Sequence, residues 1–390
     1  MQGANQSYSF IVKNPQISSL KADSFIKITR NSMGLRGEEF NSKKHKVKIL
    51  TVGGSTTECI ILSDGTTWPD LLQKKFVDSD VWVGNGGVNG QSTFGHIPYL
   101  RDHYLKLKPD IVIFLIGANE LNKYYLNNQG QPAYDFGREE PYQYNKLFPN
   151  SAPSSSEEVT TTLGQVFWHK VYEYKNYSKI LLNIIELRSR KLTEKYNLGH
   201  VHNVDLINNK HIQQAEILDQ NYEFEVDLKK LKTLKVNPDR LKNELKKQVD
   251  HRSMVRANIE TLINISLENN IIPVFVTQPA LFGPQIDSRT KVNLGTMILQ
   301  AGNALVGPGF SGNEMWSMQE VYNDITRDLA AKRNVPLIDL ASLMPKDSLY
   351  YYDYVHFSRP GAEKVADILY RPVCKVVKSN LLADKNCSGD

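Results

Sequence analysis

Residues 46–57 read KVKILTVGGSTT, and this stretch decides the fold. The run Val47–Val52 is mostly apolar and β-branched, and its length is typical of a buried strand. Gly53 and Gly54 follow and allow the backbone to turn sharply. Ser55 comes next, so we expect it at the carboxyl end of this strand, where α/β folds bind their ligands.

The same pattern recurs along the chain, with helical segments between the apolar runs. Strands are predicted at residues 81–83, 110–116, 271–277 and 335–340. Helices are predicted at 67–76, from 93–98 to 107, and at 253–268, 316–332 and 360–377. Strands that alternate with helices predict a doubly wound, three-layer α/β/α fold around a parallel sheet, of the flavodoxin-like kind.

Composition divides the chain into a core and additions to it. The predicted core is 46–123 with 251–378, preceded by an extended arm at 1–45 and followed by a tail at 379–390; a mostly helical insertion spans 124–250. The insertion has two open interpretations, a cap over the site or a solvent-facing decoration. Arg36 in the arm is interpreted as a solvated side chain.

Charge and composition exclude several classes of protein. A chain of 390 residues with 41% hydrophobic and 23% charged residues is an ordinary globular one. Its formal net charge of +5 is too weak to indicate a nucleic-acid partner. We see no signal peptide and no apolar run long enough to span a membrane. The compartment and oligomeric state stay open, with a location outside the cytoplasm or in the cell envelope as a hypothesis.

Neither the cysteines nor the histidines indicate a metal site. Cys59, Cys374 and Cys387 lack zinc-binding spacing and are interpreted as three thiols, although the last two can pair under oxidising conditions. His200 and His202 form an HxH pair in a polar segment without cysteine, so we interpret them as surface residues. We therefore expect no metal and no cofactor.

The glycine-rich stretches match none of the common ligand-binding motifs. No GxxxxGK[ST] is present, so a P-loop is excluded. GNGGVNG, residues 84–90, does not keep the GxGxxG spacing and is predicted to be a loop after the second strand. GGSTT lacks the last glycine of the GxSxG nucleophile elbow.

What remains is a set of residues placed just beyond predicted strands. Ser55 follows the first strand, Gly90 the second and Asn119 the third. Asp353 and His356 lie three residues apart beyond the fifth. Because the carboxyl ends of parallel strands share one edge of the sheet, we expect these residues to converge.

These residue types suit acyl transfer. A serine hydroxyl needs a base to take its proton, and His356 can act as that base. Asp353 can orient the imidazole and stabilise its charged form. The backbone N–H groups of Ser55 and Gly90 and the side-chain amide of Asn119 can bind the oxyanion. Taken alone, however, Asn119 is also a common helix N-cap.

Four blocks of this sequence resemble the SGNH hydrolases, also called the GDSL esterase/lipase family. The blocks are Gly53-Gly54-Ser55, the stretch 85–90 that ends at Gly90, Gly117-Ala118-Asn119-Glu120, and Asp353-Tyr354-Val355-His356. They occur in the family's order and cover roughly 46–125 and 265–375. Gly54 and Glu120 depart from the pattern, because the family often has Asp at both places.

The resemblance implies a serine esterase with Ser55, His356 and Asp353 as its triad. We expect it to hydrolyse a small acyl ester, with acetyl as the acyl group and a carbohydrate as the favoured substrate. An O-acetyltransferase with the same triad, acting on a glycan, is one alternative. A non-catalytic glycan-binding or assembly protein on the same scaffold is another. The tyrosines at 350–352 and 354 either form an aromatic wall for such a substrate or pack against the sheet.

Overall fold

The apolar runs pair side by side as one parallel sheet. The computed structural model describes residues 6–12, 24–76, 80–127, 233–300 and 309–381. Within them the main sheet has five strands in the order β4-β3-β5-β6-β9. These are β3 (Val47–Gly53), β4 (Val81–Gly87), β5 (Ile111–Ile116), β6 (Ile272–Thr277) and β9 (Leu337–Ile338). Counted along the chain, this is 2-1-3-4-5, the flavodoxin-like order, so the predicted fold class is confirmed.

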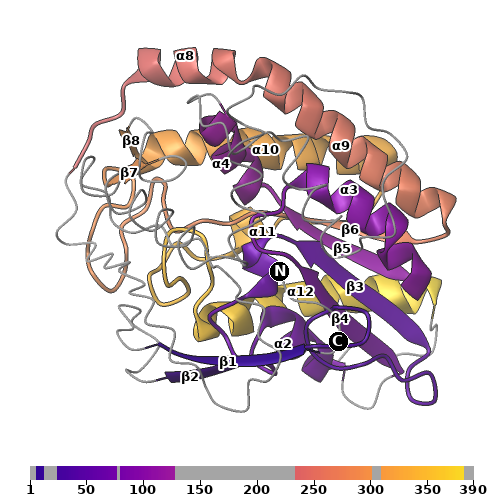
Figure 1. Ribbon diagram of the computed structural model, residues 1–390. Coiled ribbons are helices and arrows are strands. Elements are labelled where there is room, and N and C mark those ends of the chain that lie inside the picture. Colours follow the sequence, from indigo (N-terminus) through magenta and orange to yellow (C-terminus); the bar gives the residue numbers. More distant parts are fainter. Residues whose placement is uncertain (1–5, 13–23, 77–79, 128–232, 301–308, 382–390) are drawn as a thin grey trace, which may run out of the picture.

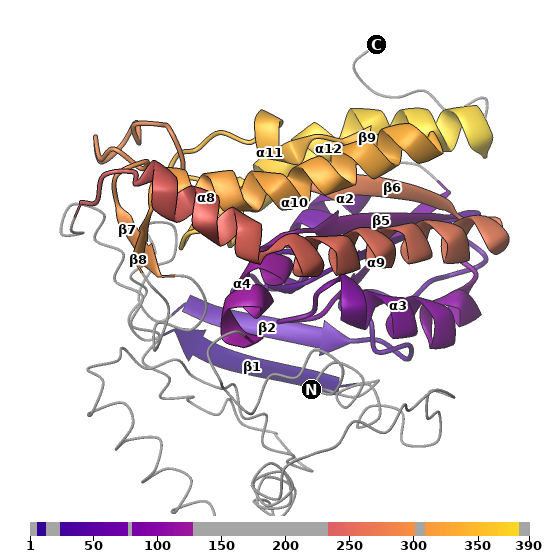
Figure 2. The same ribbon diagram turned by 90° about the horizontal axis from the view of Figure 1, so that it is seen from above.

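Helices cover both faces of the sheet (Figures 1 and 2). On one face α2 (Trp68–Lys75) and α12 (Arg359–Asn380) contact each other. On the other lie α3 (Thr93–Asp102), α9 (Val249–Glu268) and α10 (Gly312–Arg333). The shorter helices are α1 (Ser55–Glu58), α4 (Ala118–Asn127), α8 (Pro238–Lys247), α11 (Leu340–Leu343) and the 3₁₀ helix Tyr104–Leu107. β5 is buried along its whole length, as two covered faces require.

Capping boxes fix where two of the long helices begin. The Thr67 side chain accepts the Asp70 N–H at 3.3 Å, and Asp70 in turn accepts the Thr67 N–H at 3.2 Å, at the start of α2. Ser311 and Glu314 repeat the arrangement at the start of α10. Each box satisfies two backbone donors that the first helical turn would otherwise leave unpaired.

Two antiparallel pairs lie outside the main sheet. In the arm, β1 (Gln6–Val12) pairs with β2 (Ser24–Arg30). β7 (Ile298–Gln300) pairs with β8 (Gly309–Ser311), between β6 and α10. The last strand of the main sheet is shorter than predicted, because Asp339 ends it and α11 follows at once.

The prediction of a loop over residues 84–90 was partly wrong, because β4 continues to Gly87. Close packing explains its glycines. A Cβ on Gly86 would press on the Thr51 carbonyl, and one on Gly87 would overlap the backbone of Glu58. Glycine therefore lets α1 sit directly on the end of β4.

The interpretation of Arg36 as a solvated side chain was also wrong. The residue is only 2% exposed, and its guanidinium donates to the carbonyls of Glu58 at 2.5 Å and Cys59 at 2.8 Å. It also donates to the Leu62 carbonyl and pairs with Asp64 at 3.0 Å. Burial of Arg36 is compensated because its guanidinium donates to buried carbonyls at and just after the end of α1.

Several sequence-based expectations concern other parts of the chain. Most of the predicted insertion and the pair His200 and His202 lie outside the described residues. Cys374 is disulfide-bonded, so the interpretation of three thiols was wrong, while Cys59 is a buried free thiol. No helix in the described ranges is long and apolar enough to cross a membrane. Within the same ranges, no group of three His, Cys, Asp or Glu residues could hold a metal ion.

Candidate active site

The turn after β3 presents Ser55 as predicted. Gly54 precedes α1, and Ser55 is the first residue of that short helix. A Cβ on Gly53 would overlap Thr57 and the Leu115 carbonyl, so the helix can start this close to β5 only because glycine stands there. Ser55 is 9% exposed, which leaves its hydroxyl at the surface of the core.

Ser55, His356 and Asp353 form one hydrogen-bonded chain. His356 Nε2 lies 2.6 Å from Ser55 Oγ, and His356 Nδ1 lies 2.6 Å from Asp353 Oδ2. Because an ionised carboxylate only accepts, Nδ1 carries the proton and Nε2 is left to accept from the serine. The structure thus brings together three residues that span 301 positions of the chain.

The loop between α11 and α12 holds Asp353 and His356 in register. Asp353 Oδ1 accepts the backbone N–H groups of Val355 and His356, each at 2.8 Å. Burial alone would raise the pKa of Asp353, but the charge of His356 and these hydrogen bonds hold it below its ordinary value. The aspartate is therefore ionised at neutral pH and can stabilise an imidazolium.

Gly90 lies in a tight turn. The Gln91 N–H donates to the Val88 carbonyl at 3.1 Å, and Gly90 has a φ of +76°, as the third residue of a type II turn requires. A Cβ at Gly90 would meet nothing within 4 Å. Conformation, and not a close neighbour, is therefore the reason for glycine at this position.

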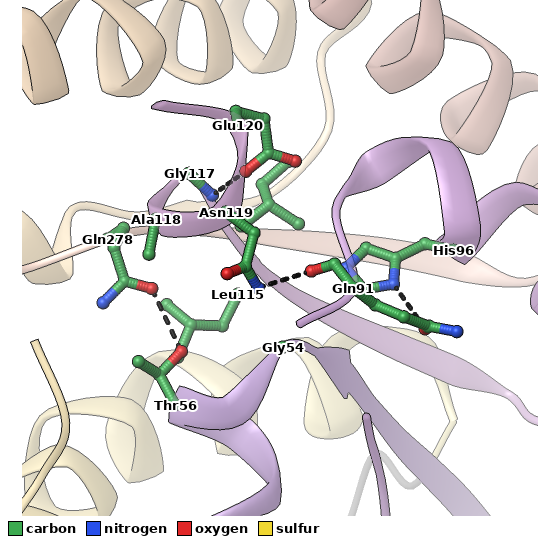
Figure 3. A pocket seen from close by; sticks show the side chains of 11 residues that line it. Gly54, Thr56, Gln91, His96, Leu115, Gly117, Ala118, Asn119, Glu120 and Gln278 are labelled. Atoms are coloured by element: carbon green, nitrogen blue, oxygen red, sulfur yellow. Dashed lines mark hydrogen bonds between the residues drawn. The ribbon is translucent and has the colours of Figure 1, made fainter. Parts of the chain in front are cut away.

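Asn119 approaches the same place from α4. It is the second residue of that helix, so it is not the N-cap that its residue type also allows. Its Nδ2 donates to the Gln91 carbonyl at 2.6 Å (Figure 3). Among the residues that the structure describes, no acceptor takes the backbone N–H of Ser55 or of Gly90. Asn119, from the end of β5, thus lies beside both the Ser55 turn and the loop that follows β4.

Gly54 is in direct contact with Asn119. A Cβ on Gly54 would overlap Asn119 Nδ2 and would lie 3.1 Å from the Gln91 carbonyl. The Asp that the family often has at this position does not fit with Asn119 placed as it is here. The departure at position 54 is therefore coupled to the position of the amide.

A small cavity adjoins the Ser55 turn, and several of its side chains were not identified from the sequence (Figure 3). Thr56 donates to Gln278 Oε1 at 3.1 Å, and His96 Nδ1 donates to Gln91 Oε1 at 3.3 Å. Glu120 is 2% exposed and accepts the N–H groups of Gly117 at 2.9 Å and Thr93 at 2.6 Å. The sequence identified Glu120 as the residue that departs from the family's third block, and it did not predict these hydrogen bonds.

Glu120 lies in the first turn of α4 and also connects two other segments. It holds the turn that ends β5 and the first residue of α3 together. Burial raises the pKa of its carboxyl, and the hydrogen bonds from Thr93 and Gly117 oppose that rise. Glu120 thus links the two loops that carry Gln91 and Asn119.

One aromatic ring lies against the catalytic candidate histidine. The Tyr352 ring stacks on His356 with centroids 5.2 Å apart and planes inclined by 18°. Tyr350, Tyr352 and Tyr354 are half-buried, whereas Tyr351 is buried and packs near Phe357. Tyr351 is part of the core and Tyr350 and Tyr354 pack against it, as the packing interpretation predicted, while an aromatic wall for a substrate stays a prediction.

Comparison with known proteins finds similar solved structures. No family model matches the chain, and no curated protein matches it. Among solved structures, the acetyl xylan esterase AlAXEase is 13% identical, with a TM-score of 0.40, over 84% of this chain and 100% of that one. The psychrotrophic esterase EstA from Pseudoalteromonas sp. is 11% identical, with a TM-score of 0.40, over 85% and 100%. The lipase/acylhydrolase from Enterococcus faecalis is 14% identical, with a TM-score of 0.38, over 87% and 100%.

In the order of its four blocks and of its strands, the chain resembles the SGNH hydrolases, as predicted from the sequence. The strand order is that of the doubly wound sheet which the blocks implied. We argue function below from the geometry of the site and not from the likenesses to other structures.

The buried His96 predicts how stability depends on pH. Burial lowers the pKa of His96 to about 3, so the folded state keeps the ring neutral while the unfolded chain protonates it below about 6.5. Stability is therefore full above pH 6.5 and is lost as the pH falls. Between pH 7 and 5 the wild type should lose about 2 kcal/mol more unfolding free energy than His96→Gln. Urea unfolding at both pH values measures this, and equal losses in the two proteins would contradict it.

Proposed function

We propose that this protein is a serine ester hydrolase that uses Ser55, His356 and Asp353 as its catalytic triad. The observation that carries the proposal is the chain of two 2.6 Å hydrogen bonds from Ser55 Oγ through His356 to Asp353. The unpaired donors beside Ser55 support it, because acyl transfer needs both an activated nucleophile and an oxyanion hole.

In the first half-reaction Ser55 Oγ attacks the carbonyl carbon of the ester while His356 Nε2 takes the hydroxyl proton. The carbonyl oxygen becomes an oxyanion, which accepts from the N–H groups of Ser55 and Gly90 and from Asn119 Nδ2. Asp353 stabilises the imidazolium. When the tetrahedral intermediate collapses, the bond to the alcohol breaks, and His356 gives its proton to the leaving oxygen.

In the second half-reaction a water molecule attacks the acyl-Ser55 ester. His356 takes a proton from that water, and the same donors bind the oxyanion a second time. Collapse breaks the bond to Ser55 Oγ, which regains its proton from His356 and releases the carboxylic acid.

For the substrate we propose a small acyl ester, acetyl in the first place, on a carbohydrate. The cavity flanked by Gly54 and Thr56 is small and polar, which suits a short acyl group better than a fatty chain. Tyr352, half-buried beside His356, offers an aromatic ring on which the C–H face of a sugar can stack.

Replacing the nucleophile tests the proposed reaction. Ser55→Ala should lower kcat on p-nitrophenyl acetate at least about 10³-fold, because the remaining groups stabilise the oxyanion but cannot form the acyl-enzyme. The kcat of His356→Ala should fall by a similar factor. The kcat of the double variant, Ser55→Ala with His356→Ala, should fall little further because the two residues act as a unit. Equal, non-zero turnover by wild type and Ser55→Ala would refute the proposal.

Gly54→Ala tests the oxyanion hole without removing a donor. Its added methyl overlaps the end of the Asn119 side chain and lies 3.1 Å from the Gln91 carbonyl, so a displaced amide and a shift of a few tenths of an ångström should let the protein fold. We expect kcat to fall about 10²-fold, the usual scale for one lost oxyanion donor. The kcat of Asn119→Ala should fall by the same factor. The kcat of the double variant, Gly54→Ala with Asn119→Ala, should be no lower than that of either single variant. Steady-state kinetics and melting temperatures of the three variants check this; additive losses in the double variant would show that Gly54 acts elsewhere.

A further inference from the structure

One buried carboxylate beside the nucleophile has no part in the reaction as written. Glu58 ends α1, three residues after Ser55, and its side chain is 6% exposed. Its Oε1 pairs with Arg30 Nη2, which the arm brings to the core. Its Oε2 accepts the backbone N–H of Asn89 at 2.6 Å. The carboxylate therefore joins three segments: the arm, the nucleophile helix and the loop after β4.

The hydrogen bond from Asn89 to Glu58 lies within the turn that contains Gly90. Asn89 and Gly90 are the two central residues of the turn closed by the Gln91 N–H and the Val88 carbonyl. The peptide between them carries the Gly90 N–H, which is the second proposed oxyanion donor. In a type II turn that peptide has one orientation and in a type I turn roughly the opposite one. Fixing Asn89 therefore also fixes where the Gly90 N–H points.

Two further hydrogen bonds attach the turn and the end of β4 to the end of β3 and to α1. The Val88 N–H donates to the Gly53 carbonyl at 3.0 Å, and Asn85 Nδ2 donates to the Thr57 carbonyl at 3.0 Å. Asn89 itself is exposed and, in the described part of the chain, its N–H is held by the Glu58 side chain. Glu58 is thus the side-chain link between the nucleophile and the turn.

We propose that Glu58 is a positioning residue that orients the Gly90 N–H toward the oxyanion by holding Asn89, with Arg30 keeping the buried carboxylate paired. This rests on the proposed esterase function. It adds a link through which the N-terminal arm reaches the reaction, by way of Arg30 and Glu58. The arm is then part of the catalytic unit and more than a cover for the sheet.

A pair of double variants separates the hydrogen bond from the charge. Arg30→Met with Glu58→Gln removes both charges but keeps an amide oxygen that can accept from Asn89. Arg30→Met with Glu58→Leu removes the acceptor as well. We expect the first double variant to keep kcat within about threefold of wild type. The second should lose about 10- to 100-fold in kcat with KM nearly unchanged. That loss is smaller than the loss expected when a whole oxyanion donor is removed.

A cycle with Gly90→Ala shows whether the effect passes through the turn. If Glu58 acts by orienting the Gly90 N–H, the Glu58→Leu loss should largely vanish in the Gly90→Ala background, because coupled residues are not additive. A purely structural role would give additive losses. Glu58→Asp is a milder second test: one methylene shorter, it keeps the charge but should lose the bond to Asn89 and some kcat.

Glu314 supplies a matched control. It is another buried glutamate that pairs with an arginine, Arg240, and accepts backbone N–H groups, from Ser311 at 2.8 Å and Asn237 at 3.0 Å. Arg240→Met with Glu314→Leu should lower the melting temperature but leave kcat within about twofold. A similar loss of kcat there would show that any buried ion pair has this effect.

The outcomes separate the two proposals. If wild type hydrolyses p-nitrophenyl acetate and Ser55→Ala does not, the esterase stands whatever the Glu58 variants do. Wild-type kcat in the Glu58→Leu double variant, or an equal loss in the Glu58→Gln one, would overturn the role of Glu58 alone. Full activity in Ser55→Ala would overturn both.

Discussion

The site depends on the absence of side chains where β3 ends. Cβ atoms on Gly53 and Gly87 would overlap α1, and one on Gly54 would overlap Asn119. Because all three positions are glycine, the nucleophile helix, the end of β4 and the start of α4 approach within van der Waals contact. Any side chain here would separate elements that must supply groups to one reacting carbon.

Packing these elements closely together buries backbone carbonyls and the Glu58 carboxylate. Two buried arginines compensate for this burial by pairing with those groups. The carbonyls at the end of the short helix α1 have few partners within it, and Arg36 donates to those of Glu58 and Cys59. Arg30 compensates the Glu58 carboxylate in the same way. Removing only one partner of a buried ion pair destabilises the fold far more than replacing both partners, because the remaining charge is buried and unpaired. This explains why the segment before β3 is attached to the core at two arginines.

The sequence predicted what depends on local pattern and on chain order. The apolar runs identified the strands, and because parallel strands end at one edge, Ser55, Gly90 and Asn119 could be placed together before any contact was known. The contacts of Arg30, Arg36 and Glu58 could not be predicted in this way. Their partners lie 22 to 31 residues away without periodicity, so only the packed structure pairs them. The same holds for residues 84–87, where glycines that indicate a loop serve close packing within a strand.

The histidine at the centre of this arrangement is held from three sides. Asp353 fixes its tautomer through Nδ1 and, by accepting two backbone N–H groups, also fixes the loop that carries it. Tyr352 stacks on its face, so rotation of the ring would break both the stacking and the hydrogen bond. The side chain is still 24% exposed, which leaves a path for the leaving alcohol and the incoming water. In the proposed reaction one imidazole moves a proton four times per turnover, and a histidine fixed in this way can do so without losing its position.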